Sequence, residues 1–133
     1  MELTKNVPLV VTDKIDELKV YYMENFKFTV TFEMDRHLCL KAPGKGGVEI
    51  SFMNPEGDQM PPFDGKGLIF CLEVDDVDAE YERLNKLGVT VVQPPQDNPW
   101  GDRSLITIDP IGINLYIHKP IPPTAEFKKH FKE

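Results

Sequence analysis

The stretch LIFCLEVDDVDAEYERLNKLGVTVV (residues 68–92) decides the fold, because it joins a strand, a helix and a second strand without interruption. Its apolar start, residues 68–74, ends at Asp75-Asp76, whose carboxylates can accept the free backbone N–H groups of a helix N-terminus. Apolar residues then recur at helical spacing, at Val77, Tyr81, Leu84 and Leu87. Gly88 falls where helices commonly end in the left-handed conformation, and residues 89–93 have the composition of the next strand.

The rest of the chain completes this unit and repeats it. Two further predicted strands, 103–108 and 113–118, extend the order to βαβββ. The first half has the same order: a strand at 6–11, a helix capped at Thr12-Asp13 with Ile15, Leu18, Tyr22 and Phe26 on its apolar face, and strands at 27–34, 37–41 and 48–53. A duplicated unit explains the repeat. We therefore predict a single domain of two modules, 6–53 and 67–118, with a linker at 54–66 and a C-terminal tail at 119–133.

Length, charge and cysteine content limit the class of protein. A chain of 133 residues and 15.2 kDa fits one domain. Its net charge of −7 argues against a nucleic-acid partner and suits a cationic or neutral small molecule. No apolar run approaches the roughly 20 residues that span a bilayer, and the N-terminus lacks a signal peptide's apolar stretch. We therefore expect a cytoplasmic protein with no membrane partner, in which Cys39 and Cys71 are buried free thiols.

Strand alternation separates two faces of the predicted sheet. One set of rows is continuously apolar and suits packing under the helices: Val48, Ile50 and Phe52; Leu68, Phe70, Leu72 and Val74; Leu115 and Ile117. The opposite rows are mixed: Glu49, Ser51 and Met53; Ile69, Cys71 and Glu73; Asn114, Tyr116 and His118. The sequence thus predicts an α+β fold whose mixed sheet has one core face and one face available to a ligand.

Three short motifs accompany the paired modules. Leu87-Gly88-Val89 closes the second helix, Asp109-Pro110-Ile111-Gly112-Ile113-Asn114 forms a turn before the last strand, and Pro99-Trp100-Gly101 precedes the strand that leads to this turn. Together these features resemble the vicinal oxygen chelate superfamily of glyoxalase I, bleomycin resistance proteins and extradiol dioxygenases, and most of all its bleomycin-resistance branch. The resemblance implies two modules that form a cupped mixed sheet with a ligand in its hollow, and a homodimer whose grooves are shared between subunits.

The resemblance also identifies the positions where the family's metalloenzymes hold their ion. These positions are occupied here by Asn6, Glu49, Ile69 and Tyr116. Only Glu49 is a conventional ligand, and one carboxylate is too few for a divalent ion. We therefore predict no metal and no cofactor at this place.

The candidate ligand-binding residues are Asn6, Glu49, Phe63, Ile69, Trp100, Tyr116 and His118. Trp100 can be a stacking wall for a flat or cationic ligand, or a hydrophobic plug or dimer contact. Phe63 can close the site or pack locally. Glu49 can pair with a cationic ligand or act as a base, or be an ordinary hydrogen-bonded carboxylate. The tail, with Phe127 and Phe131 one helical turn apart, can dock or fray.

Two functions from different classes follow. The preferred one is a metal-free protein that sequesters an aromatic or cationic small molecule and performs no catalysis. The alternative is a metal-dependent lyase, isomerase or dioxygenase of the same superfamily, with a displaced site that uses Glu49, His37 or His118. A third possibility is a pure assembly module, which would bind no ligand tightly.

Overall fold

The repeated βαβββ order is present in the computed structural model of the protein, which describes residues 1–56 and 60–132. The chain divides into two units, Met1–Lys66 (unit 1) and Gly67–Glu133 (unit 2), and each is described by itself. Residues 57–59 of the predicted linker and residue 133 of the predicted tail lie outside the described residues.

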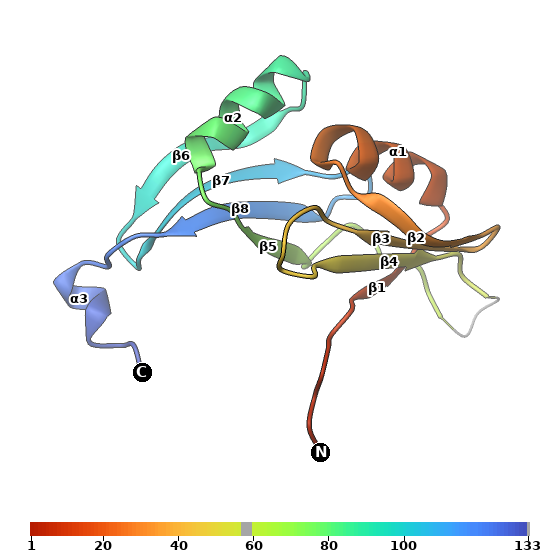
Figure 1. The fold of residues 1–133 in the computed structure, drawn as a ribbon, viewed down its shortest axis with the longest axis horizontal. Helices are drawn as coiled ribbons and strands as arrows, with labels where there is room; N and C mark the ends of the chain where they lie inside the picture. Colours follow the sequence, from red (N-terminus) through yellow and green to blue (C-terminus); the bar gives the residue numbers. More distant parts are fainter. Residues whose placement is uncertain (57–59, 133) are drawn as a thin grey trace. The chain divides into compact units, whose positions relative to one another are not determined.

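Unit 1 is a four-stranded mixed sheet with one helix on one of its faces (Figure 1). Its elements are β1 (Leu9–Val11), α1 (Ile15–Phe26), β2 (Thr29–Met34), β3 (His37–Lys41) and β4 (Glu49–Met53). The strand order is β1-β4-β3-β2, with β1 parallel to β4 and the other pairs antiparallel. Leu18 and Tyr22 of α1 are fully buried, and the Tyr22 ring stacks on Phe52 of β4 with 5.9 Å between the ring centres. The apolar face of α1 therefore forms the core with the apolar row of the sheet.

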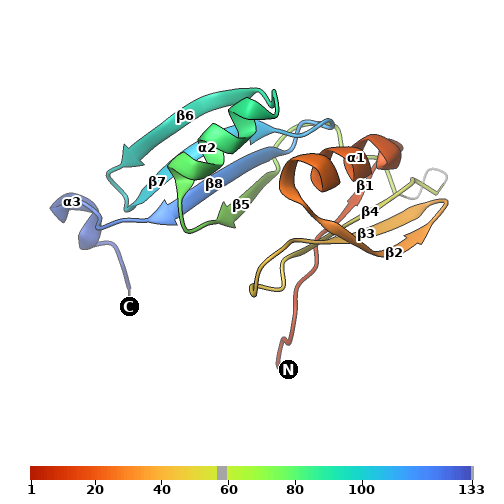
Figure 2. The ribbon, with the colours of Figure 1, turned by 45° about the horizontal axis from the view of Figure 1, so that its top comes forward.

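Unit 2 repeats this topology (Figure 2). Its elements are β5 (Ile69–Glu73), α2 (Val77–Lys86), β6 (Val91–Asn98), β7 (Asp102–Ile108), β8 (Asn114–Pro120) and the single-turn helix α3 (Ala125–Lys128). The strand order is β5-β8-β7-β6, with β5 parallel to β8. Asp76 caps α2 as predicted, since its carboxylate accepts the N–H of Ala79 at 3.0 Å. Gly88 has φ +77°, the left-handed conformation predicted for the end of the helix.

The division of each sheet into a core face and an open face is confirmed. Ile50 and Phe52 in unit 1, and Phe70, Leu115 and Ile117 in unit 2, are buried. The other residues of these rows are less buried: Leu68, Leu72 and Val74 are half-buried, and Val48, which precedes β4, is exposed. The opposite rows are more accessible, with Ile69, Cys71 and Glu73 exposed and Asn114, Tyr116, His118, Glu49 and Met53 half-buried. Ser51 is the exception in these rows, because it is buried. The helix of each unit covers the core face alone, so the opposite face stays open among the described residues of that unit.

The start of unit 1 differs from the prediction in two ways. The first strand spans Leu9–Val11 and not 6–11, so Asn6 lies in the exposed segment before it. The N-cap of α1 is Lys14, without a side-chain hydrogen bond, because the Thr12 hydroxyl is used instead to accept the Lys14 N–H at 3.2 Å. The predicted Thr12-Asp13 cap is therefore wrong, although the helix itself is present.

Two predictions about unit 2 and the cysteines are also wrong. The strand predicted at 89–93 spans Val91–Asn98 as β6 and therefore continues across Pro94 and Pro95. Proline is tolerated here because β6 is an edge strand and its pairing shifts register between Gln93 and Gln96. Both thiols are free, but Cys39 is half-buried and Cys71 is exposed. Each lies on the open face of its sheet, where burial by the helix does not reach.

No helix among the described residues combines the length and the apolar character needed to cross a bilayer.

Candidate functional site

The open face of unit 2 brings together three of the predicted site residues, Ile69, Tyr116 and His118. Tyr116 and His118 project from the same face of β8, with their ring centres 5.5 Å apart. The adjacent parallel strand β5 places Cys71 opposite Tyr116 and Glu73 opposite His118. Ile69 lies at the start of β5 on the same row and is 55% exposed. The result is an accessible surface with two rings on it.

A hydrogen-bond network fixes the Tyr116 phenol at the edge of this surface. Its hydroxyl lies 2.8 and 3.0 Å from the two carboxylate oxygens of Asp102, to which it donates. The Asn98 amide donates to Asp102 Oδ1 at 2.7 Å and to the Ser104 hydroxyl at 2.9 Å, and accepts from Gln96 Nε2 at 2.9 Å. Asn98 and Ser104 are buried. The Asn98 amide also donates to the Tyr116 hydroxyl at 3.4 Å, so the network connects β6, β7 and β8 and holds the phenol and the carboxylate in fixed positions.

Burial and the network both shift the pKa of Tyr116. Burial raises the pKa of the phenol above its ordinary value of 10.0, and the hydrogen bond and negative charge of Asp102 add to this effect. Hydrogen bonds from Ser104 and Trp100 act in the opposite direction but do not outweigh it. Tyr116 is therefore a neutral phenol at physiological pH, and the negative charge of the site belongs to Asp102.

Trp100 lies in the turn between β6 and β7 and is 46% exposed. The tail is docked on this turn: the N–H of Ile121 donates to the Gly101 carbonyl and the N–H of Thr124 to the Pro99 carbonyl, each at 2.9 Å. Phe127 of α3 makes an edge contact with Trp100, with ring centres 6.4 Å apart. The sequence left open whether the tail docks or frays. These contacts show that residues 121–127 dock on the turn. One edge of the indole is supported, and nearly half of its surface stays accessible.

The predicted site residues of unit 1 are not joined into a comparable network. Asn6 is exposed ahead of β1, and Phe63 is half-buried, with its N–H donating to the Val11 carbonyl at 2.8 Å. Glu49 is half-buried and forms an ion pair with Lys5. Its charge is thus already matched within unit 1, which weakens the case for Glu49 as the partner of a cationic ligand.

The donor set does not fit the divalent metal ion that the family's metalloenzymes hold. Asn6 and Ile69 supply no strong ligand, Tyr116 stays protonated, and Glu49 is paired with Lys5. Within residues 1–56 and 60–132, no group of three or more His, Cys, Asp and Glu side chains lies close enough to hold a metal ion. We therefore derive no chemistry through a divalent ion at these positions.

The sequence patterns did not identify Asn98 or Ser104 as residues of the site. Asn98 belongs to a stretch with three nearby prolines, where a polar residue carries no signal. The strand register brings these residues together: Asn98 pairs with Asp102, and Ser104 with His118 on the next strand. That pairing cannot be obtained from local composition. Phe127 was noted in the tail, but nothing in the sequence predicted its contact with Trp100.

The chain belongs to the Glyoxalase/Bleomycin resistance protein/Dioxygenase superfamily, whose sequence pattern it matches over residues 6–117. It is similar to TnmS3, an antibiotic binding protein from Streptomyces sp. CB03234, with 27% identity and a TM-score of 0.70, over 90% of this chain and 99% of that one. A bleomycin resistance determinant encoded on the transposon Tn5 has the same fold, with 19% identity, a TM-score of 0.69 and coverage of 89% and 98%.

An uncharacterized protein of Mycobacterium bovis is 36% identical to this chain over 67 residues. The match covers 49% of this chain and 44% of that protein, so the chain corresponds to less than half of the relative's length.

Proposed function

We propose that the protein binds a planar aromatic molecule with a cationic group on the open face of unit 2 and sequesters it without converting it. The observation that carries the proposal is the half-exposed Trp100 beside a buried network that presents the Asp102 carboxylate. Stacking and cation–π contact on the indole contribute roughly 0.5–2 kcal/mol each. Asp102 supplies the opposite charge, and the chain's net charge of −7 attracts cations at longer range.

The similarity to TnmS3 supports binding over turnover. That protein is described as antibiotic binding, and its identity to this chain, 27%, is the highest among the structures compared above. A Tyr116 phenol that is protonated and already hydrogen-bonded to Asp102 suits the recognition of a ligand and is poorly placed to accept a proton from one. We also propose that the protein is a homodimer, as the family resemblance implies. Ile69 and His118 then form part of the wall of the site.

The test uses Trp100, which is the single tryptophan of the chain and therefore an intrinsic reporter of the site. We expect a planar aromatic cation such as acridine orange to quench its fluorescence in a saturable way, and an aromatic anion such as naphthalene sulfonate to have little effect. Calorimetry of Trp100→Ala and Asp102→Asn should show binding weakened about tenfold in each, the equivalent of roughly 1.4 kcal/mol. Asp97→Asn, which removes an exposed carboxylate from the neighbouring strand position, is the matched control and should bind as the wild type does.

Recovery of the bound compound unchanged, by mass spectrometry after prolonged incubation, would separate sequestration from catalysis. Conversion of the compound only when a divalent ion is added would favour the metal-dependent enzyme. Equal binding of the cation and the anion, or binding that is unaffected by Trp100→Ala, would contradict the proposal. Light scattering of the purified chain at several concentrations tests the homodimer separately.

A further inference from the structure

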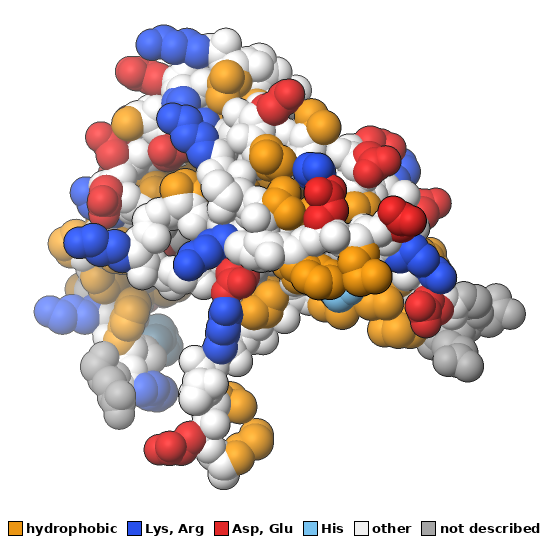
Figure 3. Space-filling model, turned by 45° about the vertical axis from the view of Figure 1, so that its right-hand side comes forward, with side chains coloured by type: hydrophobic (Ala, Val, Ile, Leu, Met, Phe, Trp, Pro, Cys, Tyr) orange, Lys and Arg blue, Asp and Glu red, His pale blue; other side chains and the backbone are white. Residues whose placement is uncertain are grey.

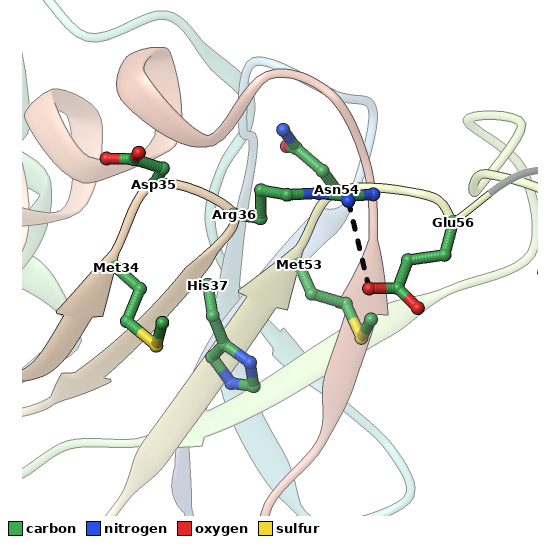
Figure 4. A pocket seen from close by; sticks show the side chains of 7 residues that line it. All are labelled: Met34, Asp35, Arg36, His37, Met53, Asn54 and Glu56. Atoms are coloured by element: carbon green, nitrogen blue, oxygen red, sulfur yellow. Dashed lines mark ion pairs between the residues drawn. The ribbon is translucent and has the colours of Figure 1, made fainter.

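A second group of side chains on the open face of unit 1 has no role in the proposed function. Met34 ends β2, His37 begins β3 and Met53 ends β4. The three residues are direct neighbours across the sheet, because His37 is paired with Met34 on one side and with Met53 on the other. They line a pocket of about 580 Å³, and Figure 4 shows both thioethers and the imidazole on the same side of the sheet.

Met34 is exposed, His37 and Met53 are half-buried, and none of the three has a hydrogen-bond or ion-pair partner among the described residues. Met34 is 63% exposed, and Phe32, whose ring meets the edge of the His37 ring with 5.7 Å between centres, is 48% exposed. On one face of the molecule, Figure 3 shows hydrophobic side chains gathered beside a histidine. Among the residues that the structure describes, the His37 ring takes part in no hydrogen bond or ion pair. Both of its nitrogens are therefore free to bind a ligand.

The spacing of the strands allows one ion to reach all three side chains. Neighbouring strands lie about 4.8 Å apart, so the Met34 and Met53 backbones flank His37 at a total separation of about 10 Å. A methionine side chain extends its sulfur toward the middle of this span with freely rotating bonds. The hairpin between β2 and β3 has only Asp35 and Arg36 in its turn, which fixes Met34 beside His37 at little entropic cost.

The chemistry of this donor set selects the ion. Thioether sulfur is a soft ligand that favours monovalent copper and its chemical relatives over magnesium, calcium or manganese, and neutral imidazole binds copper well. The set lacks the carboxylates that hard cations need, because Asp35 points away from the three side chains and Glu56 is paired with Arg36. The face of Phe32 can add a cation–π contact.

We propose that Met34, His37 and Met53 form a binding site for a soft monovalent cation, Cu(I) or its redox-inert analogue Ag(I). This site is in unit 1, is independent of the ligand surface of unit 2, and requires no change of oxidation state. It accounts for an exposed methionine, a half-buried methionine and a histidine that has no hydrogen bond or ion pair among the described residues, placed side by side on three strands. Neither the core nor the sheet hydrogen bonds require this arrangement.

The experiment measures Ag(I) binding to the full chain in chloride-free buffer. Cys39→Ser and Cys71→Ser are introduced first, so that thiolates cannot account for the binding. The methionine methyl groups are labelled with carbon-13; the chain has five methionines, at positions 1, 23, 34, 53 and 60, and therefore five NMR signals. We expect one equivalent of Ag(I) to shift the signals of Met34 and Met53 and the ring signals of His37, and to leave the other three methionines unchanged.

Variants then test each ligand. Met34→Leu and Met53→Leu keep side-chain volume, so they should fold normally and weaken Ag(I) binding at least tenfold each, whereas Met23→Leu on helix α1 is the matched control and should have no effect. The melting temperature with and without Ag(I) gives a second readout, with stabilisation expected only where Met34, His37 and Met53 are all intact. Shifts of all five methionines alike, or one-equivalent binding that survives the Met34→Leu, Met53→Leu double variant, would overturn the proposal.

Discussion

The two units share one topology but have different open faces. Both sheets have the same strand order, with a parallel pair at one edge and a helix over the apolar rows. On the open face of unit 2, an amide, a carboxylate and a phenol are hydrogen-bonded to one another. On the open face of unit 1, two thioethers and an imidazole lie together without polar partners among the described residues. The core rows are restricted by burial and therefore stay alike, whereas the open rows are free to acquire different chemistry.

The largest loss of stability is expected from substitutions in the buried apolar rows, which both units have. Phe52 is fully buried under α1, and its replacement by alanine removes its stacking with Tyr22 and leaves a cavity. We expect Phe52→Ala to lower the free energy of unfolding by about 3–5 kcal/mol, and Leu115→Ala in unit 2 by about 2–5 kcal/mol. Urea denaturation measures both values.

Hydrogen exchange shows where each substitution acts. The residues around Phe52 belong to unit 1 and those around Leu115 to unit 2, so faster exchange should begin in the strands of the affected unit. Uniformly faster exchange in β3 and β7 after either substitution would contradict the description of two units with separate cores.

A smaller loss of stability should distinguish the open face of unit 2 from that of unit 1. Asn98 is buried with four hydrogen-bond partners, so Asn98→Ala removes one donor from Asp102 and one from Ser104 and should cost about 1–3 kcal/mol. Asn54 in unit 1 is the matched control, because its buried Oδ1 has no hydrogen-bond partner among the described residues. Asn54→Ala removes an unsatisfied acceptor and should change stability by less than about 0.5 kcal/mol. Thermal unfolding compares the two variants, and equal losses would show that the network in unit 2 adds no stability.

The sequence predicted what depends on local periodicity. The strand from 68 to 74, the Asp76 cap and Gly88 follow from spacings within a few residues, and the structure confirms all three. The predicted N-cap of α1 is wrong. Thr12 and Asp13 are residue types that commonly cap helices, but the Thr12 hydroxyl accepts a hydrogen bond from the Lys14 N–H instead. Composition shows which side chains can cap a helix, and only the backbone path shows which of them does.

The chemistry of the open faces depends on register between distant strands and was only partly predictable. Alternation placed Tyr116 and His118 on the open face of unit 2. The hydrogen bonds that join Tyr116 to Asp102 and Asn98 depend on the pairing of β6 with β7 and of β7 with β8. The β6–β7 pairing includes a register shift near two prolines. The same holds in unit 1, where Met34, His37 and Met53 become neighbours only through two strand pairings.

The ends of the two helices provide a third comparison. Unit 2 uses Gly88 at φ +77°, whereas unit 1 places Lys27 at φ +58°, a conformation that costs a residue with a side chain about 1–2 kcal/mol. Gly88→Ala should therefore destabilise the protein by about 1 kcal/mol through backbone strain alone, since an added Cβ would contact nothing within 4 Å. Lys27→Gly should stabilise it by about 0.5 kcal/mol, because the relief of strain exceeds the entropy that glycine loses on folding. Chemical denaturation measures the change in the free energy of unfolding for both variants, and a loss of stability in Lys27→Gly would refute the strain argument.

The smallest expected effect is the shift in the pKa of Tyr116 on the open face of unit 2. Burial raises the pKa of Tyr116 above 10.0, so the folded protein favours the neutral phenol. The stabilisation that results is fully present below pH 10 and is lost as the pH rises through the pKa of the folded state. The chain has four tyrosines, and the difference between the phenolate absorbance curves of the wild type and Tyr116→Phe isolates the contribution of Tyr116. We expect this difference to titrate above pH 10 and to move toward lower pH in Asp102→Asn, because the negative charge that opposes phenolate formation is then gone. A difference curve centred at or below pH 10 would mean that water reaches the phenol freely, and the network of Asn98, Asp102 and Ser104 would then be no more preorganised than the open face of unit 1.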